Sequence, residues 1–162
     1  MCMKKSFLRL ISSFGFFLAL SVYGITPQGG VANFSGLLTV APGGSTPTIG
    51  FVASGQTSFL VRAVGPSLKT LGVQNPVASP VLHFFDSTGK EIIFVHSEIA
   101  LNWPAIFASV GAFPLSGGPD AYEVDSFAPG AYTIQVTDSS GKGGTVLLEM
   151  YQGPNVVPLG GP

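Results

Sequence analysis

Charged residues are scarce in this chain. Only 9% of its 162 residues are charged, against about a quarter in typical soluble proteins. Of its 7 lysines and arginines, three stand within residues 4–9, and the others are scattered as Arg62, Lys69, Lys90 and Lys142. Nucleic-acid binding needs clustered cations, so a nucleic-acid partner is excluded. A surface made instead of small polar and apolar groups favours association with further copies of the chain or with other proteins.

Cysteine and histidine are nearly absent as well. The single cysteine, Cys2, has no partner for a disulfide within the chain, so the fold must hold without covalent cross-links. His83 and His96 are the only histidines, and neither a Gly-x-Ser-x-Gly motif nor a His-x-x-x-His spacing occurs. Glu123 and Asp125 share one face of a predicted strand and form the only pattern similar to a glycosidase carboxylate pair. We therefore predict no catalytic residue and no enzyme, with a small secreted hydrolase as the weakest alternative.

The N-terminal residues have the pattern of an export signal. Basic residues within positions 4–9 precede an apolar run over positions 10–22, which ends near the small residue Gly24. This order is typical of a secretory signal peptide, here residues 1–24. The run is shorter than the roughly 20 residues that a membrane span needs, so we expect no integral membrane span after cleavage. The exported protein is then expected outside the cell or on its outer surface, with the periplasm as the alternative.

The rest of the chain alternates short β-type runs with turns of Gly, Pro, Asp and Ser, at the spacing typical of sandwiches and barrels. These runs predict strands over Asn33 to Val40, Thr48 to Ala53, Ser58 to Val64, Val81 to Asp86, Glu91 to His96, Ala121 to Phe127, Ala131 to Thr137 and Thr145 to Tyr151. We expect an all-β fold, a jelly-roll-like antiparallel sandwich of two sheets with about eight strands and one short helix. It forms one domain over residues 25–153, followed by an irregular Pro- and Gly-rich tail over residues 154–162.

The strand faces give further expectations. Residues 51–53 and 92–95 are apolar on both faces, so their strands are expected to be central or covered by another element. His83 alternates with Val81 and Phe85, which favours a histidine in the core or in an interface over a general base.

One segment has helical spacing. Asn102 can cap it, Pro104 fits a first turn, and Gly111 ends it. The apolar residues at helical spacing are Trp103, Ile106, Phe107 and Val110. We predict a short helix over one end of the sandwich, with Trp103 packed in the core. The alternative is that Trp103 faces a ligand, as exposed aromatic residues do in sugar-binding modules.

Two turns have the same chemistry. Residues 86–90 and 138–142 each begin with an aspartate, Asp86 or Asp138, and have a glycine where a positive φ is wanted. Both patterns predict hairpin connections. The alternative makes the two aspartates calcium ligands, but the spacing of an EF-hand is absent and calcium needs 6 to 8 oxygen ligands. We therefore expect no cofactor, with calcium as the weak alternative.

Arg62 is the most unusual single residue, because it lies inside an otherwise apolar strand. A buried arginine needs an acidic or carbonyl partner. Asp120, Asp125 and Glu149 are the candidates, and we expect a structural ion pair that fixes strand register. The alternative is a recognition site for a carboxylate.

Several pieces of sequence occur together in a fixed order. They are GFVASG at 50–55, LVRAVGPSL at 60–68, NW at 102–103, VGAFPL at 110–115, DA at 120–121, APGAYT at 128–133 and LLEMY at 147–151. The series resembles a β-sandwich accessory module of large secreted and surface proteins of bacteria, which is distantly similar to pre-peptidase C-terminal domains. The resemblance implies an accessory or structural role. Where the family has an Asn-Asp-Asx-Trp cluster after its fifth strand, this chain has residues 96–98, His-Ser-Glu, and then Asn102 and Trp103.

Two functions from different classes lead. The first is a secreted, non-catalytic structural or surface-assembly module, whose partners are copies of itself or other cell-surface proteins. The second is a module that binds carbohydrate or the cell surface, which requires at least two exposed aromatic residues on one face. Its candidates are Trp103, Tyr122, Tyr132 and Tyr151.

Overall fold

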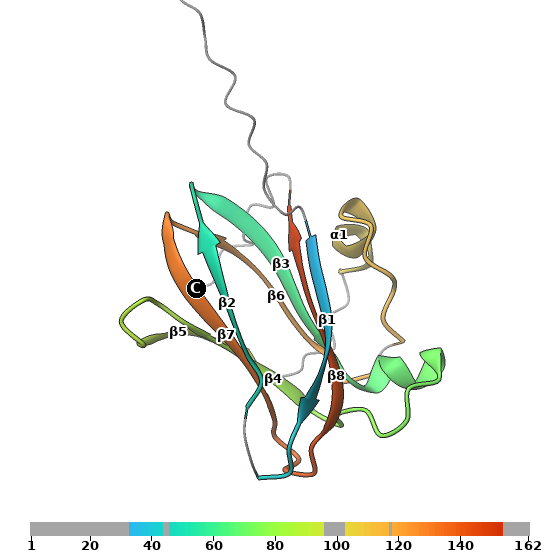
Figure 1. The fold of residues 1–162 in the computed structure, drawn as a ribbon. Coiled ribbons are helices and arrows are strands. Elements are labelled where there is room, and N and C mark those ends of the chain that lie inside the picture. The colour runs from blue at the N-terminus through green and yellow to red at the C-terminus, as the bar shows by residue number, and fades with distance from the viewer. Residues whose placement is uncertain (1–32, 44–45, 96–102, 117, 154–162) are drawn as a thin grey trace, which may run out of the picture.

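A computed structural model describes residues 33–43, 46–95, 103–116 and 118–153 (Figure 1). Its elements are β1 (Asn33–Val40), β2 (Thr48–Ala53), β3 (Thr57–Val64), the 3-10 helix η1 (Pro66–Leu71), β4 (Pro80–Phe85), β5 (Glu91–Val95), α1 (Pro104–Ser109), β6 (Ala121–Phe127), β7 (Gly130–Asp138) and β8 (Gly144–Gln152). Each predicted strand overlaps one of these strands, and the predicted helix is α1. The predicted signal peptide and the C-terminal tail lie outside the described residues, as do His96 and Asn102.

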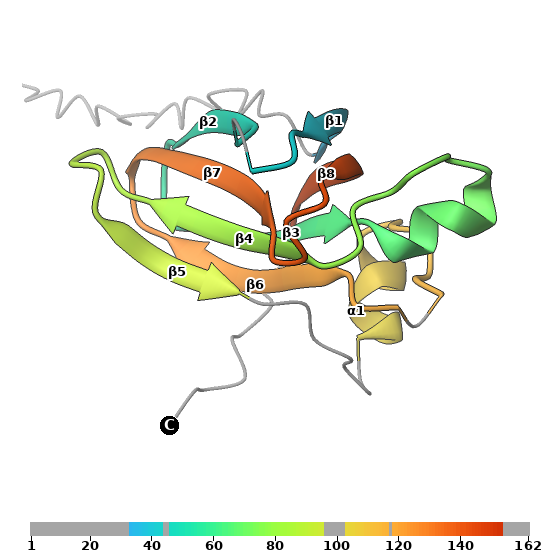
Figure 2. The ribbon, with the colours of Figure 1, turned by 90° about the horizontal axis from the view of Figure 1, so that it is seen from below.

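The strands form two antiparallel sheets of four. The first sheet has the order β1-β8-β3-β6, and the second sheet has the order β2-β7-β4-β5. Strands that follow one another along the chain mostly cross from one sheet to the other, and this order is that of an eight-stranded jelly roll. The predicted all-β, jelly-roll-like sandwich is therefore confirmed. Figure 2 shows that β1 and β2 lie along one side of the sandwich, whereas β5 and β6 lie along the opposite side.

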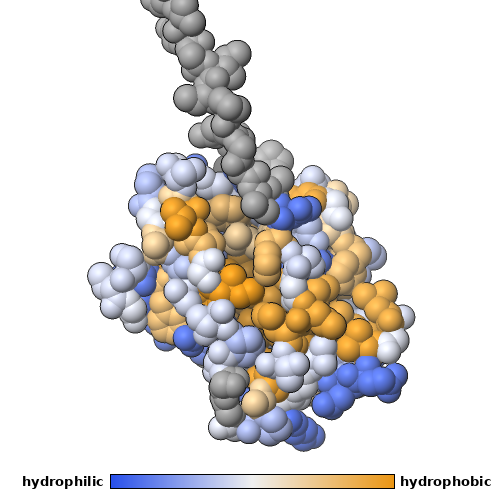
Figure 3. All heavy atoms as spheres, viewed as in Figure 1, coloured by the Kyte–Doolittle hydropathy of each residue, from blue (hydrophilic) through white to orange (hydrophobic). Residues whose placement is uncertain are grey.

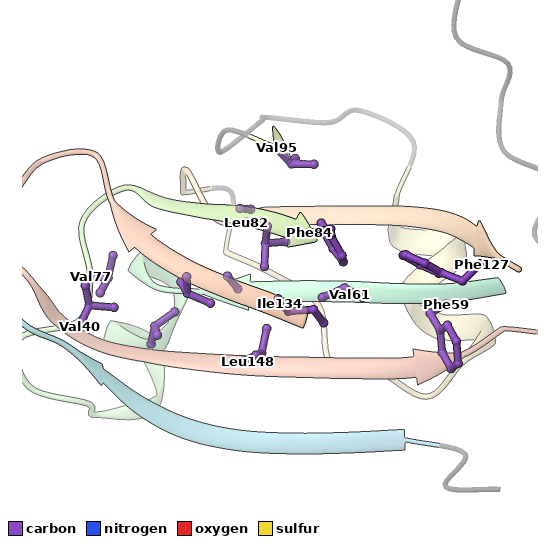
Figure 4. Close-up of a cluster of buried hydrophobic side chains, with 14 of the residues drawn as sticks. Val40, Phe59, Val61, Val77, Leu82, Phe84, Val95, Phe127, Ile134 and Leu148 are labelled. Atoms are coloured by element: carbon purple, nitrogen blue, oxygen red, sulfur yellow. The ribbon is translucent and has the colours of Figure 1, made fainter. Parts of the chain in front are cut away.

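The main core fills the space between the sheets. Alternate residues of β3, such as Phe59 and Val61, point inward to meet Phe84 and Ile134 of the second sheet (Figure 4). Phe127 of β6 joins them, packing against Phe59 with ring centroids 6.1 Å apart. Since full burial of one such side chain contributes about 1.5–3 kcal/mol, this core accounts for a stable fold without disulfides.

A second apolar layer lies on the other face of the first sheet, beneath α1. We call it the outer cluster, and its buried members are Leu60, Phe107, Ala112, Tyr122, Val124 and Tyr151. Proline at the start of α1 fixes the first turn, and Phe107 is the buried residue through which the helix packs. In the described part of the chain, neither helix has the length and hydropathy of a membrane span.

One expectation about the strands is wrong. The two strands that are apolar on both faces, β2 and β5, are not central, because each is an outermost strand of the second sheet, and no described element covers their outer faces. Their outward-facing residues are accessible, with Val52 74% exposed and Ile92 41% exposed. A run without alternation is typical of a buried strand, but here its outer apolar residues face away from the core.

Candidate functional site

Arg62 lies on the outer face of β3 and is completely buried, with 0% of its surface exposed. Its Nε and Nη2 atoms donate to Glu149 Oε2 at 3.0 and 2.5 Å, and its Nη1 donates to the carbonyl oxygen of Phe113 at 2.7 Å. The guanidinium carbon also lies 4.7 Å from the ring centroid of Phe107 and 4.6 Å from that of Phe113. The side chain therefore ties β3 to β8 and to the segment that follows α1.

Glu149 links Arg62 to Tyr151, and we call these three residues the buried network. Its second oxygen, Oε1, accepts a hydrogen bond of 2.7 Å from the hydroxyl of Tyr151. Burial raises the pKa of Tyr151 to about 12, and the hydrogen bond to Glu149 and the negative charge of that carboxylate act in the same direction. Because the guanidinium is enclosed and already bonded, it offers little to an incoming carboxylate. The arrangement is suited to holding the fold together.

The other two candidate partners of Arg62 have different contacts. Asp120 is buried, and its Oδ1 accepts from the backbone N–H groups of Gly65 at 2.7 Å and Ser67 at 3.3 Å. Its Oδ2 accepts from the hydroxyl of Ser67. Asp125 accepts from the backbone N–H of Ser126 at 2.7 Å. Of the three acids proposed for Arg62, the structure therefore places only Glu149 against it, while Asp120 secures the start of η1.

Sequence reasoning missed η1 itself. Gly65 followed by Pro66 and Ser67 is the pattern in which proline occupies the first helical position, and this signal was available. The role of Asp120 had no local signal, because its partners stand more than 50 positions away, with a separation of 55 residues from Gly65.

Asp86 and Asp138 serve their own turns. Asp86 Oδ1 accepts from the backbone N–H of Thr88 at 2.8 Å and from its hydroxyl at 2.6 Å. Asp138 accepts from Ser140 N at 3.0 Å and from Gly143 N at 2.9 Å. The hydrogen bonds from Thr88 lower the pKa of Asp86. Partial burial raises the pKa of Asp138, but the hydrogen bonds that it accepts, first those from Ser140, hold it below its ordinary value.

The two turns are also far apart. Asp138 pairs with Pro80 at the start of β4, whereas Asp86 follows Phe85 at its end. At about 3.4 Å per residue, the six steps from Pro80 to Asp86 separate the two turns by about 20 Å. No group of three or more potential metal ligands occurs within the described ranges. The two aspartates are therefore not brought together into one site.

The aromatic residues considered for ligand binding are mostly enclosed. Trp103 is half-buried and packs on Tyr122 and Phe107, with ring centroids 5.0 and 6.3 Å apart. Tyr122 and Tyr151 are buried in the outer cluster, and Tyr132 stacks on Phe51, which is partly buried and packs against the main core. The large hydrophobic residues that stand exposed in the described part of the chain are aliphatic.

His83 lies on the outer face of the second sheet. Its Nδ1 is 2.7 Å from Glu91 Oε1, and its Nε2 is 3.0 Å from the hydroxyl of Thr137. These contacts join β4 to its two neighbours, β5 and β7. The histidine therefore cross-links the sheet on a face that is only partly buried.

The four outermost strands differ in their chemistry. β6 has Glu123 and Asp125 on its inward face, and β5 is only five residues long and begins with Glu91, beside a register irregularity at Phe84 and Phe85. Inward-pointing charges, short length and bulges are features that discourage the addition of a further strand. The carboxylate pair considered for catalysis thus lies on the inner face of an edge strand.

The side of the sandwich formed by β1 and β2 has no charged strand residue, bulge or proline within its strands. β1 has eight residues in unbroken register with β8, and its sequence NFSGLLTV contains neither charge nor proline. We call the edges of β1 and β2 the open side of the sandwich. Figure 3 looks onto this side and shows apolar residues gathered over β1 and toward η1. This surface is the strongest candidate for a functional site.

The chain was compared with known protein families, curated proteins and solved structures. No family model matches the chain, and no curated protein matches it in sequence. The pre-peptidase C-terminal domain of collagenase from Bacillus anthracis is similar at a TM-score of 0.47 and 12% identity, covering 73% of this chain and 88% of that chain. The catalytic domain of a GH87 α-1,3-glucanase is similar at a TM-score of 0.37 and 12% identity, covering 82% of this chain and 28% of that chain.

Proposed function

We propose that this protein is an exported, non-catalytic β-sandwich module that works in structural or surface assembly. The observation that carries the proposal is the difference between its two sides. The strands β5 and β6 have features that resist strand addition, whereas β1 is long, regular and uncharged. A domain with one such edge is suited to joining a larger structure through its backbone and aliphatic side chains.

The polar residues support the same conclusion, because their bonds stay inside the fold. Arg62 and Glu149 bond to each other, Asp120 secures η1, and Asp86 and Asp138 hold their turns. We assign to the Arg62–Glu149 pair the structural role of fixing the register of β3 and β8. The proposal also takes the pattern in residues 1–24 as a signal peptide, which implies work outside the cell or on its outer surface.

Carbohydrate binding has less support from the structure than from the sequence. That function needs at least two exposed aromatic side chains on one face, but Tyr122 is 7% exposed and Tyr151 is 8% exposed. Trp103 packs against the outer cluster. A hydrolase has less support still, since Glu123 and Asp125 lie on the inner face of β6.

The mass of the purified exported protein in solution tests the proposal. Light scattering over a dilution series should show a mass that rises above that of the monomer with concentration. We expect the same curve with calcium and with a chelator, because Asp86 and Asp138 already serve their turns. A monomer at every concentration would contradict self-assembly, and binding of that monomer to a glycan array would establish the second function instead.

A further inference from the structure

The open side suggests a particular partner. We propose that a second copy of this chain pairs with β1 in the antiparallel direction, about a two-fold axis at Leu37, so that the first sheet continues from one copy into the other. The inference rests on the proposed assembly function and names the partner and the contact.

The backbone of β1 provides the first argument. β1 pairs with β8 on one side, and on its other side it is the end of the first sheet. Alternate N–H and C=O groups of an edge strand point outward, and an added strand satisfies them. Because β1 has eight residues and no register irregularity, a partner strand can follow its whole length.

The sequence of β1 suits its own copy. When a strand pairs with an identical copy in the antiparallel direction, each residue faces a residue of the copy. Side chains of the same face lie together only if the numbers of these two facing residues add up to an even number. An axis at Leu37 meets this condition and sets Leu37 opposite its counterpart. It also sets Ser35 opposite Thr39 and Phe34 opposite Val40, so hydroxyl meets hydroxyl and apolar meets apolar. Such cross-strand pairs stabilise a sheet, and the strand brings no like charges together.

The side chains beside this axis are apolar and accessible. Leu37 is 60% exposed, and it lies opposite the half-buried Leu147 in register. Leu147 in turn pairs with Val64, the last residue of β3 before η1. Leu71 of η1 is 61% exposed. Figure 3 shows apolar residues over β1 and toward η1, the two elements that contain Leu37 and Leu71.

The size of the contact indicates how strong it should be. Eight residues at about 3.4 Å each make the edge about 27 Å long. The two sheets lie about 10 Å apart, and the side chains on their outer faces bring the width of this edge to about 20 Å. Each copy then buries on the order of 500 Å², or about 1,000 Å² in total. Contacts below about 1,200 Å² belong to weak and transient complexes. The pairing should therefore be reversible and depend on concentration.

Cysteine cross-linking tests the axis directly. In a Cys2→Ser background, Leu37→Cys places two thiols opposite each other, at the separation of about 4.5–5.5 Å between Cα atoms that a disulfide accepts. Thr39→Cys on the same strand is the matched control, because its two copies are then about 14 Å apart. Val52→Cys on β2 controls for random collision, since that position is the more exposed at 74%. We expect mild oxidation to link the Leu37→Cys protein at least about tenfold faster than either control.

A second variant checks the same contact without cross-linking. Leu37→Lys sets two ammonium groups opposite each other, and we expect it to weaken association about tenfold or more with an unchanged circular dichroism spectrum. The Val52→Lys protein should associate as the native chain does.

The outcomes separate this inference from the proposed function. If the native chain associates but Thr39→Cys or Val52→Cys links as fast as Leu37→Cys, the β1 axis is wrong while assembly stands. The same holds if Leu37→Lys associates normally. If the native chain stays monomeric at all concentrations, the assembly function and this inference both fail.

Discussion

Removal of Glu149 is the perturbation that best tests the buried network. In a Glu149→Ala protein, the guanidinium of Arg62 loses two of its three hydrogen bonds and keeps only the bond to the carbonyl of Phe113. Its charge then remains where 0% of the residue is exposed. Loss of one partner from a buried ion pair destabilises a protein by about 3–5 kcal/mol.

The aromatic rings around the cation reduce this cost. The guanidinium carbon keeps its positions over the rings of Phe107 and Phe113, and each such contact is worth about 0.5–2 kcal/mol. We therefore expect a net loss of about 3 kcal/mol. With a urea dependence of about 2 kcal/mol per molar, the unfolding midpoint should fall by about 1.5 M. Such a loss is a large part of the roughly 5–15 kcal/mol that holds a typical domain.

Trp103 provides the optical signal for this measurement. It packs on Phe107 and Tyr122 directly beside the network, so its fluorescence reports on α1 and the outer cluster, while circular dichroism reports on the sheets. Coincident transitions would indicate two-state unfolding. The control is Glu91→Ala, whose side chain is 43% exposed beside His83, and which should cost about 0.2–1 kcal/mol.

An apolar replacement of the whole network separates buried charge from shape. Arg62→Met, Glu149→Leu and Tyr151→Phe together remove both charges and the hydroxyl that donates to Glu149. Well-packed apolar groups often replace a buried pair at little cost, so we expect this protein within about 1 kcal/mol of the native one. A Glu149→Ala protein that loses less than about 1 kcal/mol would refute the reasoning, since the charge of Arg62 would then need no partner.

Two further predictions concern pH. The lowered pKa of Asp138 means that its ionised form stabilises the fold above the unfolded pKa of about 4, and that this contribution is lost as pH falls through the folded value. Asp138→Asn should therefore be less stable than the native protein at neutral pH in urea titrations, and a difference that does not shrink in acid would contradict this. The pKa of Tyr151, raised to about 12, has the opposite consequence, because stability is complete below about pH 10 and is lost as pH rises toward the folded value. Denaturant titrations of Tyr151→Phe should lack this alkaline loss, and a loss equal to that of the native protein would count against it.

The strands and turns were predictable from the sequence because their signals are local. Alternation of apolar and polar residues marks a strand within a few positions, and Asp and Gly mark the turns. Thus β7 follows from the alternation of Tyr132, Ile134 and Val136, and the turn at residues 138–142 follows from Asp138. The sandwich class then follows from the number and spacing of the strands.

The partner of Arg62 was not predictable in the same way. Arg62 and Glu149 stand 87 residues apart, and they meet because β3 and β8 pair in one register. By charge alone, Asp120 and Asp125 were equally good candidates for the partner of Arg62. Only the pairing of strands distant in the chain selects Glu149 among them.

The position of β2 in its sheet was also not predictable from local sequence. Apolar residues on both faces made β2 look central, and yet it ends the second sheet with Val52 exposed. An apolar residue on a strand therefore does not by itself indicate a buried position, because single apolar side chains also stand exposed on the surfaces of folded proteins.

Within the described residues, no buried side-chain nitrogen or oxygen lacks a hydrogen-bond partner. Along the outer edge of β1, backbone N–H and C=O groups point outward, flanked by aliphatic groups such as Leu37. That combination is suited to pairing with another strand, and it supports the assembly function that we propose.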